Sequence, residues 1–129
     1  MSRMRPDVFN PNCDSRQVLA LIADRWSMLV IYALGRRVRR HGELKRMIGG
    51  ISQKMLTQTL RSLERDGIVA RRVYDVVPPR VEYALTSLGQ TLLTPLGAIC
   101  RWAQNHLPQV RTAREVVSAR TRQPRWPGR

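Results

Sequence analysis

Hydrogen-bonding and cationic side chains gather along one side of a predicted helix that runs from Ile51 to Leu63. A 3.6-residue turn places Leu56, Thr59 and Leu60 on the opposite, apolar side. Lysine and arginine neutralise phosphates, and arginine and glutamine also form paired hydrogen bonds with base edges. The polar side therefore predicts contact with DNA. Its members are Ser52, Gln53, Lys54, Thr57, Gln58, Arg61 and Arg65.

A shorter helix is predicted immediately before the polar helix, over residues 42–48. Its inward side chains are expected to be Leu44, Met47 and Ile48. A turn with two glycines, at residues 49 and 50, joins the two helices. Two helices across a tight turn of this kind are typical of a helix-turn-helix, in which the first helix braces the second in the major groove.

Both ends of the polar helix are marked in the sequence. Ser52 is placed to cap the first turn of that helix, and Gly67 follows its last turn.

A β-hairpin is predicted after the polar helix. Residues 69–74 are rich in β-branched side chains, and residues 81–86 alternate apolar and polar positions, as strands do. Two prolines assign residues 75–80 to the tip of the hairpin. Helix, turn, helix and basic hairpin in this order predict a winged helix.

Two framework helices are predicted at the start of the chain. Asp14 or Ser15 is placed to cap a helix that ends near Ala23, and Gln17 completes a partial capping box. A second helix starts near Trp26. Its apolar stripe is expected to consist of Trp26, Leu29, Val30 and Ala33.

Residues 87–107 are predicted to form one long helix after the hairpin. Pro95 should bend this helix or divide it in two, because proline removes one backbone hydrogen bond. The apolar residues cover more of the helix circumference than one small domain can bury, which predicts a partner subunit. The residues expected at that interface are Leu93, Leu96, Cys100, Trp102 and Leu107.

Net charge favours a polyanionic partner. The 129 residues contain 23 lysines and arginines against 9 aspartates and glutamates, so the formal net charge is +14. Phosphate backbones and anionic membranes both attract such a chain. A membrane is the weaker interpretation, because no apolar run approaches the roughly 20 residues that span a bilayer and no signal peptide opens the sequence. We expect a cytoplasmic, nucleoid-associated protein with no membrane partner.

With these segments placed, the chain resembles the HxlR family of bacterial winged-helix transcription regulators from about Cys13 to Trp102. The matching motifs are IADRW at residues 22–26, GISQKML at residues 50–56, and VPPRVEY at residues 77–83, followed by Leu85-Thr86 and Leu88-Gly89. The resemblance implies a mainly α fold with a small β-hairpin. The domain it implies is a winged helix-turn-helix with a C-terminal dimerisation helix (13–107). An N-terminal arm (1–12) precedes this domain, and a basic tail (108–129) lies beyond the match.

The resemblance further implies a homodimer joined through its first and last helices. Two polar helices related by a two-fold axis would contact half-sites roughly 34 to 36 Å apart on a pseudo-palindromic operator. The wing would contact a flanking backbone or minor groove through Arg72 and Arg80, with Arg71 beside them. Repression is the default expectation. The alternative is a basic architectural protein that coats DNA without reading its sequence, and the framed recognition helix favours the regulator.

Cys13 is the candidate sensor residue. It precedes a helix amino terminus, whose dipole favours a thiolate; Arg16 acts in the same direction and Asp14 opposes it. The resemblance implies control by thiol oxidation or by an electrophile, because some relatives sense such compounds through a cysteine at this position. An unreactive cysteine, in a protein that responds to another small ligand or to none, stays open as the alternative. Cys100 is interpreted as a small buried apolar residue.

Other chemistries find little support. No pair among His41, His106, Cys13 and Cys100 has the close spacing of a zinc site, so neither a metal nor another cofactor is expected. The sequence has no phosphate-binding glycine loop, nucleophile elbow or paired-carboxylate pattern, which argues against an enzyme. The tail is interpreted as a basic arm that adds nonspecific DNA affinity, with a solvated end of no function as the alternative. Its arginines are Arg111, Arg114, Arg120, Arg122, Arg125 and Arg129.

Overall fold

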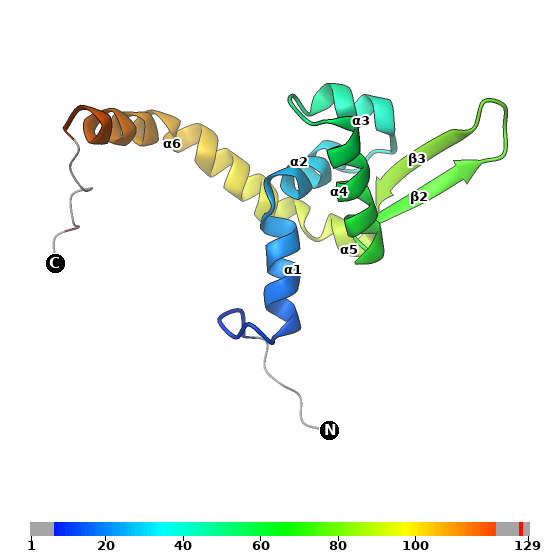
Figure 1. Ribbon diagram of the computed structural model, residues 1–129, viewed down its shortest axis with the longest axis horizontal. Helices are drawn as coiled ribbons and strands as arrows, with labels where there is room; N and C mark the ends of the chain where they lie inside the picture. The colour runs from blue at the N-terminus through cyan, green and yellow to red at the C-terminus, as the bar shows by residue number, and fades with distance from the viewer. Residues whose placement is uncertain (1–6, 121–126, 128–129) are drawn as a thin grey trace. The chain divides into compact units, whose positions relative to one another are not determined.

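A mainly helical chain with a small antiparallel sheet is seen in the computed structural model, which describes residues 7–120 and 127 (Figure 1). Residues 1–94 and 95–129 form two compact units. The order and type of the elements confirm the predicted fold class. They are α1 (Asp14–Ala23), α2 (Arg25–Leu34), β1 (Arg39–Arg40), α3 (His41–Met47), α4 (Gln53–Arg65), β2 (Val69–Tyr74), β3 (Arg80–Leu85), α5 (Ser87–Gln90) and α6 (Leu93–Arg120).

The core of the first unit lies where α2, α3 and α4 meet. The apolar side of α4 is buried as predicted, with Thr59 beside its leucines. Burial of such side chains is the main favourable contribution to folding. The largest buried residues of the core are Val30, Ile31, Leu34, Leu44, Leu56, Leu60, Leu63 and Val69.

Both ends of α4 follow the signals in its sequence. The Ser52 hydroxyl accepts a hydrogen bond from the Met55 backbone N–H at 3.0 Å, which satisfies one of the free donors of the first turn. At the other end Gly67 has a φ of +76°, a left-handed conformation that glycine adopts without strain. These two residues confirm the predicted cap and stop signals, and the helix runs from Gln53 to Arg65, two residues later at each end than the predicted 51–63.

Two predicted inward positions are wrong. Met47 exposes 49% of its surface, because Leu44 and Ile48, four residues apart, already occupy the inward side of α3. Leu29 exposes 39%, so the predicted stripe of α2 is rotated from the observed one. Trp26 and Ala33 are only partly buried. The buried side of α2 consists of Ser27, Val30, Ile31 and Leu34.

The predicted caps of α1 are also wrong. The N-cap is Cys13, whose side chain makes no capping bond, and Asp14 is already the first helical residue. In the next helix the cap is a carboxylate. Asp24 accepts hydrogen bonds from the backbone N–H groups of Trp26 at 3.1 Å and Ser27 at 3.2 Å. The break between α1 and α2 is therefore stabilised by Asp24.

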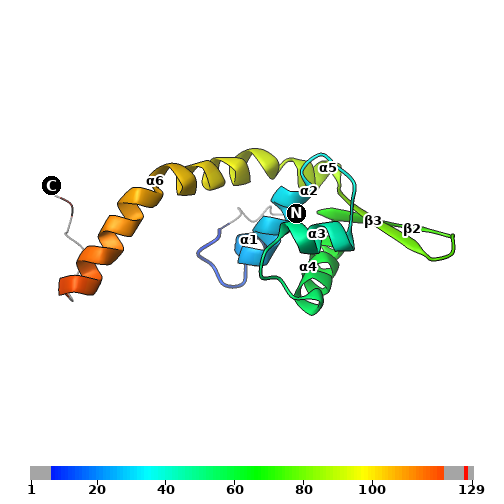
Figure 2. The same ribbon diagram turned by 90° about the horizontal axis from the view of Figure 1, so that it is seen from above.

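A three-stranded antiparallel sheet contains the predicted hairpin. The strand order is β1-β3-β2, with Val69 opposite Leu85 and Tyr74 opposite Arg80. Strand β1, which pairs Arg39 with Tyr83, was not predicted from the sequence. In both Figure 1 and Figure 2 the hairpin extends away from α3 and α4. The helix-turn-helix and wing thus have the predicted order.

The predicted long helix after the hairpin is divided in two. The chain forms the short helix α5, makes a turn at residues 91–92 and resumes as α6 at Leu93. Pro95 falls in the first turn of α6, where its missing N–H costs no intrahelical bond. The helix then continues through Pro108 to Arg120, across the boundary assigned between domain and tail. Arg122, Arg125 and Arg129 lie outside the described residues.

The base of the hairpin lies close against α5. Thr86 caps α5 by accepting a hydrogen bond from the Gly89 N–H at 3.0 Å. A Cβ on Gly89 would collide with the backbone carbonyl of Ile68, so only glycine fits there.

No single helix within residues 7–120 and 127 is long and apolar enough to cross a membrane. The helices α1 and α2 meet the criteria of length and hydropathy only when they are taken together, and this pair is bent by 73°.

Candidate nucleic-acid interface

The polar side of α4 projects into solvent. Gln53, Lys54, Gln58, Arg61 and Arg65 are exposed, and the leucines on the other side of the helix fix their direction. The predicted outward orientation is therefore confirmed for these five side chains, while their contact with DNA stays a prediction. The helix presents charge and paired hydrogen-bonding groups from a rigid element, as direct recognition of base edges requires.

Two predicted members of this surface are already engaged within the protein. The hydroxyl of Ser52 caps α4, as described above. Thr57 is partly buried, and its Oγ1 lies 3.1 Å from Nε2 of His41 on α3. This hydrogen bond joins the first residue of the bracing helix to the middle of the recognition helix. Thr57 is thus placed to position α4, a function the sequence did not indicate because His41 is 16 residues away.

Stacking with an aromatic ring positions the arginines of the wing. The guanidinium carbon of Arg80 lies 4.2 Å from the ring centre of Tyr74, and that of Arg72 lies 5.7 Å from it. Such cation–π contacts restrict the arginine side chains while leaving their N–H groups available. Nε of Arg80 is buried and has no hydrogen-bond partner among the described residues. Contact of these two arginines with phosphates stays a prediction.

A cavity of about 440 Å³ lies between α4 and the sheet. Arg71 crosses it, with Nε 3.5 Å from Oε2 of Glu64. Burial raises the pKa of the Tyr83 hydroxyl, which the positive charge of Arg71 partly offsets, so Tyr83 stays a hydrogen-bond donor at neutral pH. Glu64, a residue of α4 itself, and Tyr83 were not among the predicted site residues, and Tyr83 becomes a neighbour of α4 only through the strand pairing.

Comparison with known proteins agrees with this geometry. The sequence profile of the family described as HxlR-like helix-turn-helix matches residues 21–111. The chain belongs to the HxlR family. It is 42% identical over 113 residues to YtfH, a transcriptional regulator of the helix-turn-helix type from Escherichia coli, a match that covers 88% of this chain and 90% of the relative. The resemblance seen in the sequence is thereby confirmed, and with it a DNA-binding, helix-turn-helix transcriptional regulator.

Solved structures of related proteins have the same fold. The putative transcriptional regulator YtfH from Salmonella typhimurium matches with a TM-score of 0.80 at 42% identity, covering 86% of this chain and 99% of that protein. The redox regulator HypR in its reduced form matches with a TM-score of 0.71 at 35% identity, covering 77% and 98%. This HxlR-family chain is therefore similar to regulators over nearly their whole length.

The candidate sensor of this HxlR-family protein lies at the start of α1. Cys13 is partly exposed, its Sγ accepts a hydrogen bond from the Asp7 backbone N–H at 3.3 Å, and it lies 3.0 Å from Oγ of Ser15. These bonds lower the pKa of the Cys13 thiol, and the bond from Asp7 has the largest effect. The guanidinium of Arg16, expected to assist, instead donates to the Phe9 carbonyl at 3.2 Å. The pKa of Cys13 is thus lowered by hydrogen bonds to its sulfur instead of by the predicted charge of Arg16.

The expected interface residues lie along α6, between Leu93 and Leu107. Trp102 exposes 57% of its surface and stacks on His106, with ring centres 4.8 Å apart. Leu107 is also exposed, Leu96 is buried, and Leu93 and Cys100 are partly buried. The expectation of a buried Cys100 is therefore only partly met. The exposed members of this set, together with Ile99, form an apolar surface on α6.

Proposed function

We propose that this protein recognises a pseudo-palindromic DNA site as a homodimer and represses transcription there, in the cytoplasm and in association with the nucleoid. The observation that carries the proposal is the exposed polar side of α4, held outward by a fully buried apolar side. Lys54 and Arg65 supply charge for phosphates, and Gln58 and Arg61 supply hydrogen bonds for base edges. Arg72 and Arg80 of the wing contact the flanking DNA.

A titration against genomic fragments tests sequence recognition. The full chain is mixed with labelled fragments, including the region upstream of its own gene, in the presence of excess random competitor DNA. A regulator retains a small set of fragments, because specific sites are typically bound 10³-fold or more tighter than random DNA. Equal competition by random DNA for every fragment would favour the coating protein instead. Footprints of the retained fragments should show two half-sites.

Dimer formation is supported by the apolar surface of α6. Ile99 and Trp102 each expose more than half of their surface, and association removes such area from water. Sedimentation equilibrium of Trp102→Glu should show a shift toward the monomer and a loss of operator affinity. Gln104→Glu adds the same charge on the same helix and serves as the matched control. A wild-type chain that stays monomeric at micromolar concentration would refute the dimer.

Control through Cys13 is supported by its lowered pKa and by similarity to HypR, which is described as a redox regulator. The thiolate sulfur takes one oxygen atom from hydrogen peroxide, the O–O bond breaks and hydroxide leaves, so a sulfenic acid forms. Added hydrogen peroxide should change operator affinity in the wild type and in Cys100→Ser, but not in Cys13→Ser. Equal responses in all three proteins would remove Cys13 from the control of binding, and a noncovalent ligand would remain.

A further inference from the structure

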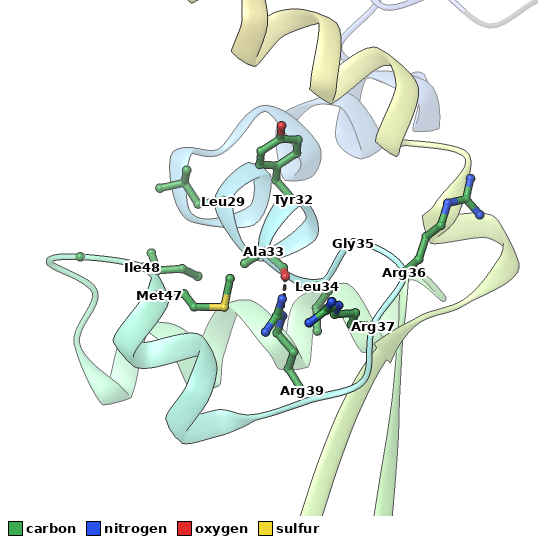
Figure 3. Close-up of a pocket in the computed structure, with 11 residues that line it drawn as sticks. Leu29, Tyr32, Ala33, Leu34, Gly35, Arg36, Arg37, Arg39, Met47 and Ile48 are labelled. Carbon is green, nitrogen blue, oxygen red and sulfur yellow. Dashed lines mark hydrogen bonds between the residues drawn. The ribbon is translucent and has the colours of Figure 1, made fainter. Parts of the chain in front are cut away.

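A second cavity, of about 530 Å³, opens between α2 and the end of α3 (Figure 3). Its volume falls within the roughly 300 to 1,000 Å³ of small-molecule sites. Leu29 and Tyr32 of α2 line it together with Met47 and Ile48. Three of these side chains are large and substantially exposed: Leu29 by 39%, Tyr32 by 48% and Met47 by 49%. The two residues whose exposure the sequence failed to predict thus line the same cavity.

Every charged side chain that lines this cavity is an arginine. Arg36 reaches outward and donates from Nη1 to Oε1 of Gln90 at 3.3 Å. Arg39 donates from Nε to the Ala33 carbonyl at 2.7 Å, and its Nη1 lies 3.9 Å from Oε2 of Glu43. The guanidinium of Arg37 forms neither a hydrogen bond nor an ion pair with the described residues. Arg37 is therefore the cation left to pair with a ligand.

The carboxyl end of α2 also borders the cavity and would by itself repel an anion, because the helix dipole is negative there. Arg39 binds the carbonyl of Ala33, and the backbone N–H of Arg37 donates to the carbonyl of Leu34 at 2.9 Å. With these two carbonyls occupied, the arginines dominate the local charge. An apolar lining with a positive edge fits a molecule that has an apolar body and a negative head.

We propose that this cavity binds a small amphipathic carboxylate, whose chain or ring contacts Leu29 and Met47 and whose carboxylate pairs with Arg37. Arginine suits this role because its planar fork can donate two parallel hydrogen bonds to one carboxylate. The binding site stands independently of the DNA-binding role. Only its regulatory effect, described next, rests on the proposed function.

The cavity shares a wall with the turn that leads into the recognition helix. Ile48, which lines the cavity, and Ile51, which precedes α4, are both almost completely buried. Between them Gly50 has a φ of +85°, and a Cβ there would lie 3.9 Å from the Trp26 ring. A ligand that separates Met47 from Leu29 moves this turn and with it the first turn of α4. Such a ligand lowers operator affinity, and the operator lowers ligand affinity by the same factor.

Calorimetry of the full chain with 4-phenylbutyrate and with its uncharged amide tests the site directly. The acid should bind saturably, and the amide about tenfold more weakly, because it lacks the charge-assisted pair. Arg37→Gln should weaken the acid about tenfold and leave the amide unchanged. Arg101→Gln, which removes an exposed arginine on α6 outside the cavity, is the matched control and should bind the acid like the wild type.

Four outcomes would overturn the site. Three concern binding: no saturable binding of the acid, equal acid affinity in Arg37→Gln and wild type, or equal affinity for acid and amide. The fourth is a change in the oligomeric state that sedimentation measures for the Leu29→Asp variant, which would assign the cavity to a protein contact. Thermal unfolding of each variant confirms that it folds.

Operator affinity measured with and without the acid tests the coupling between the cavity and the recognition helix, and unchanged affinity would overturn that coupling. Operator binding without ligand tests the proposed function separately, so the two can fail independently.

Discussion

Arg61 and Arg80 carry the same charge but are held in different ways. Arg61 is exposed on α4, where a neighbouring base edge would meet its guanidinium directly. Arg80 lies on a strand of the wing, over the ring of Tyr74, which fixes the position of its charge. A helix in the major groove reads sequence, whereas a charge on a flanking hairpin meets the backbone that every sequence shares. The two arginines should therefore differ in selectivity.

Replacing these arginines one at a time separates base recognition from phosphate contact. Arg61→Ala should weaken operator binding by roughly 1 to 3 kcal/mol and affect random DNA much less, as should Gln58→Ala. Arg80→Ala should weaken operator and random DNA alike and reduce the salt slope by about one. Fluorescence anisotropy at several salt concentrations measures both quantities. Equal losses on operator and random DNA for all three variants would contradict the assignment.

The thiol of Cys13 should titrate at a lower pH in the native protein than in the unfolded chain. Its sulfur accepts the Asp7 N–H and contacts the Ser15 hydroxyl, and both bonds stabilise the thiolate and lower the pKa. The rate of alkylation by iodoacetamide therefore rises at a lower pH in the folded state. Ser15→Ala should shift that rise upward. Cys100→Ser isolates the signal of Cys13, and a profile that coincides with that of urea-unfolded protein would contradict the expectation.

Among the helices, the junction of α1 and α2 depends on a single side chain. Asp24 satisfies two backbone donors at the start of α2, the helix that supplies Val30 and Ile31 to the core. Asp24→Ala should lower the free energy of unfolding by about 1 kcal/mol, the usual effect of losing such a cap. Chemical denaturation at fixed protein concentration measures it. Asp75→Ala, at the exposed tip of the wing, is the control and should change stability little.

Much of this architecture is predictable from local sequence. The period of Leu56, Leu60 and Leu63 locates the buried side of α4, Ser52 and Gly67 mark its ends, and two prolines mark the tip of the hairpin. Each of these signals acts over a few residues along the chain. The same holds for Pro95, which predicts an interruption in the last helical region but does not fix which side of the proline is helical.

The remaining features depend on contacts between distant segments. Strand β1 has two residues, too few for a period, and it forms only because β3 offers a free edge. The bond between His41 and Thr57 joins two different helices, so it needs the fold before its partners meet. A pattern in one segment cannot reveal the surroundings that other segments supply.

At the scale of the whole molecule, a net charge of +14 makes binding to any DNA strongly dependent on salt. The exposed Arg111 and Arg114 lie on α6 beyond Pro108, far along the chain from the recognition helix. The double variant Arg111→Gln/Arg114→Gln keeps the helix but removes two charges. If the tail acts as a basic arm, affinity for random DNA falls and the salt slope decreases, with selectivity preserved. Unchanged slopes, measured beside the Arg101→Gln control, would leave the tail without a DNA-binding role.

Strand β1 should also restrict the spacing of the contacts that an operator can offer. Its last residue, Arg40, is followed at once by α3, while its backbone pairs with β3 of the wing, so helix and hairpin cannot change their separation freely. An operator should therefore tolerate a base substitution better than an inserted base pair between the major-groove and flanking contacts. One inserted pair turns the flank by about a tenth of a helical turn. The base sequence of the binding sites should thus vary, whereas the number of base pairs between the major-groove contacts and the flanking contacts should stay constant.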